Sequence, residues 1–282
     1  MNGVLTFAAC QFSESFQPRR NAAVILRYME RAAGAGAQLL HTHEGALSGY
    51  LSNRGAPKAA DYDWPALRHA TGRIMDQAKK LRLTVLLGSA HPLSGARLPA
   101  NCVYLIGPDG RIADRYDKRF LTAGDLKAYT PGNRFVIFNR SGVRCAILIC
   151  FDLRFPELYR RLRKLGVQAV FQSFNNGSTD GPGIHTQIMR QTMQAHAGIN
   201  YFWVSATNSS AYFSRWPSVF IQPDGRIIQS LRQNAAGLMI CTIDTRKGLY
   251  DASAPFRAAA MAGKLHSGKL VNDPRQKNRR CL

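Results

Sequence analysis

The stretch that decides the fold is Ile147-Leu148-Ile149-Cys150-Phe151-Asp152-Leu153-Arg154-Phe155-Pro156-Glu157. The apolar run over 143–149 predicts a buried strand, and the closing Phe-Pro-Glu predicts a helix start. Cys150 therefore lies between a core strand and a helix, where ligands bind in open α/β folds and where a helix N-terminus favours a thiolate. Because a lone buried cysteine is usually inert core, the rest of the chain must decide whether this one is catalytic.

Strands and helices alternate along the chain. Apolar periodicity predicts helices near residues 21–35, 64–80, 156–165 and 185–197. It predicts strands near 4–12, 38–42, 83–90, 135–139, 143–149, 169–172, 202–206 and 237–243, and hairpins with Asp-Gly turns at 103–116 and 218–229. This order predicts an α/β layered domain with a mixed sheet, and its recurrence in both halves favours two similar sheets packed on each other. We expect a single domain over 1–263 and a basic tail over 264–282.

The chain is strongly basic. Its 38 Lys and Arg against 17 Asp and Glu give a net charge of +21, which attracts nucleic acid, anionic membranes or anionic substrates. However, the basic residues are spread along the sequence and form no helix-turn-helix or aromatic-rich RNA-binding pattern. We expect solvated basic faces and no specific nucleic-acid partner. A nucleic-acid-binding protein remains an alternative that rests on charge alone.

The cysteines are scattered, with no CxxC or Cys/His ligand spacing: Cys10, Cys102, Cys145, Cys150, Cys241 and Cys281. This spacing predicts neither a structural zinc or other metal site nor a disulfide framework. The sequence shows no signal-peptide pattern and no apolar run of membrane-spanning length. We therefore expect a cytoplasmic protein that does not bind a membrane.

Three polar residues, Glu44, Lys118 and Cys150, each lie directly after or at the end of a predicted strand. Nothing in the periodicity places them together in space. Their chemistry is nevertheless complementary. A thiol nucleophile needs a base, a carboxylate can serve as that base, and a cation stabilises the oxyanion of a tetrahedral intermediate.

The segments around these residues resemble the signature segments of the nitrilase (carbon–nitrogen hydrolase) superfamily, amidase-like branch. Residues 44–50 resemble its first motif with a longer gap to Ser48, and Tyr116-Asp117-Lys118 matches its Tyr-x-Lys. Residues 149–157 match its cysteine motif, with Phe151 replacing tyrosine. The resemblance covers about residues 4–247 and keeps the family's order of motifs.

This resemblance implies a four-layer α-β-β-α sandwich, homodimers or higher homo-oligomers, and a catalytic triad of Glu44, Lys118 and Cys150. It implies that Glu44 takes the thiol proton, that Lys118 and the backbone N–H of Phe151 hold the oxyanion, and that a thioester forms and is hydrolysed. The chemistry implied needs no cofactor.

The chain also departs from the family pattern. Asp125 lies where many members have a second glutamate that orders the site, and we predict a site role for it. His43 replaces the proline that usually precedes the first glutamate. Before the next strand, His196 and Ile199 replace an Arg and a Glu, although Asn200 remains, which is consistent with the joint loss of a structural ion pair.

Other residues are weaker candidates. Asp152 and Arg154 are expected to brace the turn after Cys150 through a charge-assisted hydrogen bond. Tyr50, Asn175 and His185 are candidate substrate contacts, with packing or plain loop roles as the alternatives.

The leading hypothesis is hydrolysis of a non-peptide C–N bond in a small amide, which the net charge allows to bear a carboxylate. An N-carbamoyl hydrolase or a nitrilase of the same family is the enzymatic alternative. A catalytically impaired relative that acts as a binding or assembly protein is the alternative from another class.

Overall fold

The computed structural model describes residues 3–95 and 97–280. One six-stranded sheet has the order β14-β1-β2-β3-β4-β5. Its strands are β1 (Val4–Gln11), β2 (Leu39–Thr42), β3 (Thr84–His91), β4 (Ala100–Ile106), β5 (Ile112–Asp117) and β14 (Gly237–Asp244). Strands β1, β2 and β3 run parallel; β14 pairs antiparallel with β1, β4 pairs antiparallel with β3, and β5 pairs antiparallel with β4. The sheet is therefore mixed, as its alternating elements predict.

The second six-stranded sheet has the order β13-β12-β10-β8-β7-β6. Its strands are β6 (Ile137–Arg140), β7 (Val143–Ile149), β8 (Ala169–Phe174), β10 (Trp203–Asn208), β12 (Val219–Ile221) and β13 (Ile227–Ser230). Strands β7, β8 and β10 run parallel. Strands β9 (Gly177–Ser178) and β11 (Phe213–Ser214) pair antiparallel in a separate two-stranded sheet, which the periodicity does not predict.

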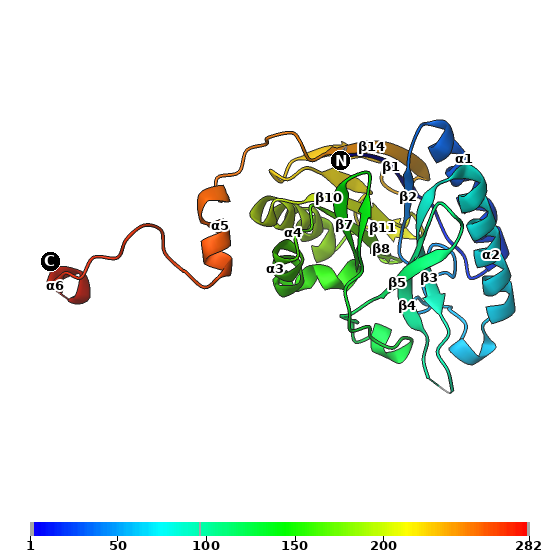
Figure 1. Cartoon of the computed structure of the whole chain (residues 1–282). Coiled ribbons are helices and arrows are strands. Elements are labelled where there is room, and N and C mark those ends of the chain that lie inside the picture. The colour runs from blue at the N-terminus through cyan, green and yellow to red at the C-terminus, as the bar shows by residue number, and fades with distance from the viewer. Residues whose placement is uncertain (1–2, 96, 281–282) are drawn as a thin grey trace. The chain divides into compact units, whose positions relative to one another are not determined.

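Two pairs of helices cover the outer faces of the sheets (Figure 1). Helices α1 (Pro18–Gly34) and α2 (Trp64–Leu81) cover the first sheet, and α3 (Pro156–Lys164) and α4 (Ile184–Asn200) cover the second. Strand β1 shows why the layers stack in this order. Phe7 points inward and packs edge-on against Phe171 and Phe220 of the second sheet, whereas its neighbours Ala8 and Cys10 join the core under α1 and α2. The α-β-β-α sandwich is confirmed.

The parallel strands bring the chemistry-bearing residues to one end of the two sheets. Glu44, Cys150 and Asn175 follow β2, β7 and β8, respectively. The backbone N–H of Glu44 donates to the carbonyl of Phe174 at 3.2 Å, so the end of β2 meets the end of β8 across the interface between the sheets. This meeting brings residues of both halves of the chain into one site.

Three short 3-10 helices, which apolar periodicity does not detect, lie in connections: η1 (Ala59–Asp61), η2 (Asp125–Lys127) and η3 (Cys150–Arg154). The chain divides into two compact units between Tyr250 and Asp251, before the tail boundary that we expected at residue 264. The second unit contains α5 (Ala254–Met261) and α6 (Pro274–Lys277). Cys281 lies outside the described residues. Among the residues described, no helix combines the length and apolarity needed to cross a membrane.

Candidate active site

Lys118 is the residue around which the site is assembled. Its side chain is fully buried at the end of β5, and Nζ donates at 2.8 Å to Glu44 Oε1 and at 2.8 Å to Asp125 Oδ2. A buried ammonium is stable only when it is paired and hydrogen-bonded, and two carboxylates satisfy it here. The structure thus brings Glu44 and Lys118 together and places Asp125 beside them.

Glu44 is held from both of its oxygens. Besides Lys118, the side chain of Asn101 on β4 donates to Oε1 at 2.7 Å, and the backbone N–H of Asn175 donates to Oε2 at 2.9 Å. Hydrogen bonds to the charged form position a carboxylate and favour its ionisation. Sequence reasoning missed Asn101, although an Asn within the apolar run of β4 is a signal of a buried polar contact.

The segment that carries Glu44 passes so close to β3 that β3 must have a glycine at the point of contact. A Cβ on Gly88 would lie 1.9 Å from the carbonyl oxygen of His43, so only glycine allows this approach. Gly49 adopts φ +74°, and a Cβ there would lie 2.8 Å from the carbonyl oxygen of Ser15. These two close approaches lock the backbone on either side of the carboxylate.

Cys150 ends β7 and starts η3 in the left-handed region, at φ +40°. A non-glycine residue in this region is uncommon and is often found at functional turns. Two residues that sequence reasoning did not assign to the site donate hydrogen bonds to backbone carbonyls of this turn. Gln172 donates to the carbonyl of Cys150 at 3.2 Å, and His196 Nε2 donates to the carbonyl of Leu153 at 3.0 Å. His196 thus has a structural role beside the nucleophile.

Asp152 braces the same turn, but not through Arg154 as we expected. Its carboxylate accepts from Tyr116 at 2.7 Å and from the backbone N–H groups of Ile149 at 3.0 Å and Phe120 at 2.9 Å. Arg154 is exposed, and within the described part of the chain its side chain forms no hydrogen bond with Asp152. Because side chains two residues apart on a 3-10 helix point in different directions, the predicted pair does not form.

The charges of the site determine which group holds the proton. Burial, followed by the adjacent Glu44 charge, raises the pKa of Cys150 well above its ordinary value. Burial also raises the pKa of Glu44, although Lys118 opposes the shift. Burial beside a carboxylate therefore dominates at the resting site, whatever the adjacent helix start contributes. The thiol is protonated at rest and needs a base.

Lys118 and Asp125 form the charged pair of the site. Burial opposes the charge of Lys118, but Glu44 and its other neighbours raise its pKa well above the ordinary value. Burial likewise opposes ionisation of Asp125, but Lys118 brings the pKa of this carboxyl below its ordinary value. Tyr50 donates to Asp125, and the Lys118 ammonium lies 5.6 Å from the centre of the Tyr50 ring. Tyr50 thus supports Asp125.

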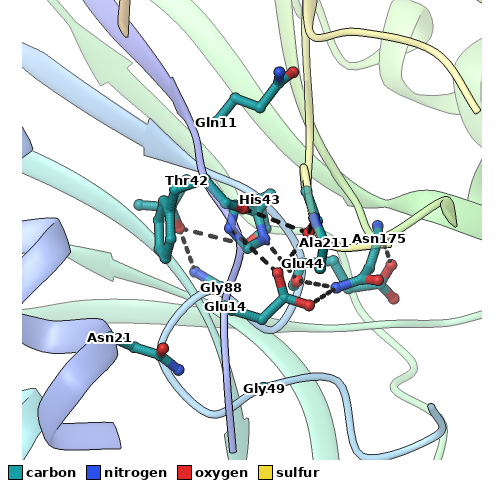
Figure 2. Close-up of polar contacts among 12 residues, drawn as sticks. Gln11, Glu14, Asn21, Thr42, His43, Glu44, Gly49, Gly88, Asn175 and Ala211 are labelled. Carbon is teal, nitrogen blue, oxygen red and sulfur yellow. Dashed lines mark hydrogen bonds and ion pairs between the residues drawn. The ribbon is translucent and has the colours of Figure 1, made fainter. Parts of the chain in front are cut away.

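Of the remaining candidates, Asn175 reaches the site. Asn175 bonds to Glu44 through both its backbone and its side chain, and Figure 2 shows it beside Glu14, a buried carboxylate that sequence reasoning missed. His185 is half-buried at the start of α4, where burial, Arg215 and Arg154 lower its pKa. A role of His185 in substrate binding stays a prediction.

A cavity of about 950 Å³ lies beside the site. It is lined by residues of three connections, including Leu51 and Gly124, the sequence neighbours of Tyr50 and Asp125. Glu44, Lys118 and Cys150 do not line it, so the cavity adjoins these three residues rather than containing them. Over residues 3–95 and 97–280, no group of three or more His, Cys, Asp or Glu is arranged to hold a metal ion.

Solved structures with the same fold include an amidase. An amidase of Nesterenkonia from the nitrilase superfamily superposes with a TM-score of 0.77 at 21% sequence identity, covering 92% of this chain and 96% of that one. This similarity shows the fold.

Curated relatives include amidases as well. The chain is 30% identical to an (R)-stereoselective amidase of Pseudomonas, over 64% of both chains. It is 26% identical to a chloroplastic omega-amidase of Arabidopsis thaliana, over 83% of this chain and 66% of that protein. The matched regions therefore span just under two thirds of these two relatives. The carbon–nitrogen hydrolase family model matches residues 6–248, most of the chain. The chain therefore belongs to the carbon–nitrogen hydrolase family.

Proposed function

We propose that this protein hydrolyses the C–N bond of small amides, with Cys150 as nucleophile, Glu44 as general base and acid, and Lys118 as oxyanion stabiliser. The observation that carries the proposal is the buried Lys118 ammonium, which bonds to both Glu44 and Asp125 and interacts electrostatically with Cys150. The amidase relatives support the same reaction class. Because Glu44, Lys118 and Asp125 are all present and paired, the alternative of a catalytically impaired relative that acts as a binding protein is less well supported.

In the acylation step, Glu44 takes the Cys150 proton as the sulfur attacks the carbonyl carbon. Lys118 and the backbone N–H of Phe151 stabilise the oxyanion, since an N–H in the first turn of a helix has no partner within that helix. When the C–N bond breaks, protonated Glu44 gives the proton to the departing nitrogen. Ammonia or an amine leaves, and the acyl group remains on Cys150 as a thioester.

In the deacylation step, a water molecule takes the place of the amine. Glu44 removes a proton from this water, which attacks the thioester carbon and forms the C–O bond. The C–S bond breaks, and Glu44 returns the proton to the Cys150 sulfur. The carboxylic acid leaves, and every group is back in its starting protonation state.

We further propose that the acyl part of the substrate carries a carboxylate. The cavity beside Asp125 is lined by three cationic side chains, Lys58, Arg97 and Lys127, among largely apolar ones. A carboxylate at the far end of an acyl chain is attracted to this set. The curated relatives include omega-amidases, among them those of Arabidopsis thaliana and Homo sapiens, which is consistent with such a substrate.

The test is ammonia release from paired amides of equal length, one with a terminal carboxylate and one without. The proposal predicts release that Cys150→Ala abolishes, and a preference for the charged amide that weakens as salt is added. N-carbamoyl compounds and nitriles in the same assay separate the related activities. Absence of release from every compound, together with failure of an amide-like alkylating agent such as fluoroacetamide to modify Cys150, would contradict it. A mutant of the Nesterenkonia amidase reacts with fluoroacetamide at its active-site cysteine.

The pH dependence of kcat/KM is expected to show an acid limb only. Glu44 must be ionised to act, and because its pKa is raised, activity falls with falling pH at values above the ordinary glutamate range. On the alkaline side the pKa values of Lys118 and Cys150 both lie well above their ordinary values, so a plateau follows. A rate that instead rises through the ordinary cysteine range would show that solvent, rather than Glu44, removes the thiol proton.

A further inference from the structure

Glu14 is a buried carboxylate beside the site that the reaction described above does not use. It lies in the connection between β1 and α1, and its side chain is 4% exposed. Its oxygens accept from Asn175 Nδ2 at 2.6 Å and from Ser209 Oγ at 2.5 Å. Because burying a carboxylate is costly unless it is hydrogen-bonded, this placement requires those partners. With both oxygens engaged, Glu14 holds protein groups rather than offering a free acceptor to a ligand.

Asn175 links Glu14 to Glu44, as Figure 2 shows. Its side-chain Nδ2 donates to Glu14 and, at 3.3 Å, to the carbonyl of Glu44, while its backbone N–H donates to Glu44 Oε2 at 2.9 Å. Both neighbours of Nδ2 can only accept, so the orientation of the amide is determined. The residue that orients Glu44 is therefore itself held by Glu14.

His43 lies beside both glutamates but hydrogen-bonds to Glu44 and not to Glu14. Its Nδ1 lies 3.1 Å from the Glu44 carbonyl, which can only accept, so Nδ1 carries the proton. Its Nε2 lies 3.8 Å from Glu14 Oε2 (Figure 2). The ring packs edge-on against Phe12 at 4.6 Å between centroids. A proline at this position, as the family usually has, offers neither nitrogen.

The segment that carries Glu14 is also tied to the segment that follows Glu44. Asn21 of α1 accepts from the backbone N–H of Ser15 at 2.9 Å and donates to the carbonyl of Leu47 at 2.9 Å. Glu14 is thus presented by a rigid loop, which is the condition for a side chain to orient another precisely.

We propose that Glu14 is a positioning residue for hydrolysis, which holds the Asn175 side chain so that the Asn175 N–H stays aimed at the Glu44 carboxylate. The inference rests on the proposed function. The same N–H favours the charged form of Cys150 and counteracts the raised pKa of this thiol. Glu14 therefore acts on both the base and the nucleophile through one residue.

The experiment compares Glu14→Gln and Glu14→Asp with Glu30→Gln, which removes an exposed carboxylate on α1. We measure kcat, KM and the pH profile with an amide that the wild type hydrolyses, together with the rate at which iodoacetamide alkylates Cys150. Both Glu14 variants are expected to lower kcat roughly ten- to hundredfold with KM within about threefold, because small misplacements of catalytic groups cost this much. Alkylation of Cys150 is expected to slow, and Glu30→Gln is expected to match the wild type.

The pH profile separates positioning from charge. Loss of the N–H donor disfavours ionised Glu44, so positioning predicts that the acid limb moves to higher pH in both variants. Simple removal of a negative charge predicts a move to lower pH in Glu14→Gln and none in Glu14→Asp. A shift to lower pH confined to Glu14→Gln, or a rise of KM with kcat unchanged, would overturn the inference.

Asn175→Ala provides the second test, and it keeps the proposal falsifiable if the Glu14 variants fold poorly. Asn175→Ala alone is expected to lower kcat and shift the acid limb as the Glu14 variants do, and adding Glu14→Gln to it is expected to change kcat little further. Full additivity would contradict action through Asn175. If the wild type neither hydrolyses amides nor shows alkylation of Cys150, the proposed function itself fails. If the wild type is active and Glu14→Gln behaves like Glu30→Gln, only this inference fails.

Discussion

Replacing Lys118 with methionine is expected to abolish amide hydrolysis and to destabilise the fold by about 3–5 kcal/mol. The ammonium is fully buried and separates Glu44 from Asp125, each at 2.8 Å. Without it, two buried carboxylates lose their shared partner and repel each other, so at least one takes up a proton. The oxyanion also loses a charged donor, a loss that typically costs about 10²–10³ in kcat. Urea unfolding and kcat measured on the same preparation check both expectations.

Two companion variants show whether these losses have the proposed cause. Lys80→Met removes an exposed lysine on α2 and is expected to leave stability and kcat unchanged. Adding Asp125→Asn to Lys118→Met removes one of the two buried charges, and is expected to recover part of the stability but none of the activity. Activity retained in Lys118→Met would contradict the role of the ammonium at the oxyanion.

Replacing Glu44 with glutamine is expected to lower kcat by about 10²–10⁴, the usual contribution of a general acid–base group. Both oxygens of Glu44 accept hydrogen bonds, from Lys118 and Asn101 on one side and from the Asn175 N–H on the other. The NH₂ of glutamine must therefore face a donor whichever way the amide turns. The variant loses proton transfer and also distorts the site.

The same variant is expected to keep the reactivity of Cys150 toward alkylating agents. The Glu44 charge raises the pKa of this thiol, and Lys118 lowers it. Removing the carboxylate leaves the cation, so the thiol ionises more readily even though no base remains to serve the amide. When both are measured on one sample, amide turnover is therefore expected to fall while iodoacetamide labelling of Cys150 is retained. Equal losses in both would show that Glu44→Gln has disordered the site rather than removed its base.

The layered fold was predictable because it leaves local signals in the sequence, and the same signals place Glu44, Lys118 and Cys150 next to predicted strands. Strand β7 (Val143–Ile149) matches its predicted range, since an uninterrupted apolar run before a Phe-Pro-Glu helix start leaves few other structures possible. Asp125 was found because it lies where many members of the family have a second glutamate. The short helix η3 was missed because five residues of mixed character show no period.

The supporting contacts were not predictable because they depend on which distant segments meet. Glu14 and Asn175 are separated by 161 positions in the sequence, and their loops, which follow β1 and β8, meet because the two sheets pack against each other. His43 could be identified as a departure from the family pattern, but its proximity to Glu14 could not. Arg154 was paired with Asp152 because of its charge, although backbone N–H groups and Tyr116 already satisfy that carboxylate. Charge complementarity along the sequence does not report which donors the fold supplies.

The acyl-enzyme is the species that tests the account most directly. Intact-mass measurement of the protein quenched during turnover of a small amide is expected to show a fraction heavier by the mass of the acyl group. Peptide mapping is expected to place this mass on Cys150, and it should be absent from Cys150→Ala. Ammonia release without any adduct on Cys150, or an adduct on one of the buried cysteines such as Cys145, would contradict a mechanism in which Cys150 forms the thioester.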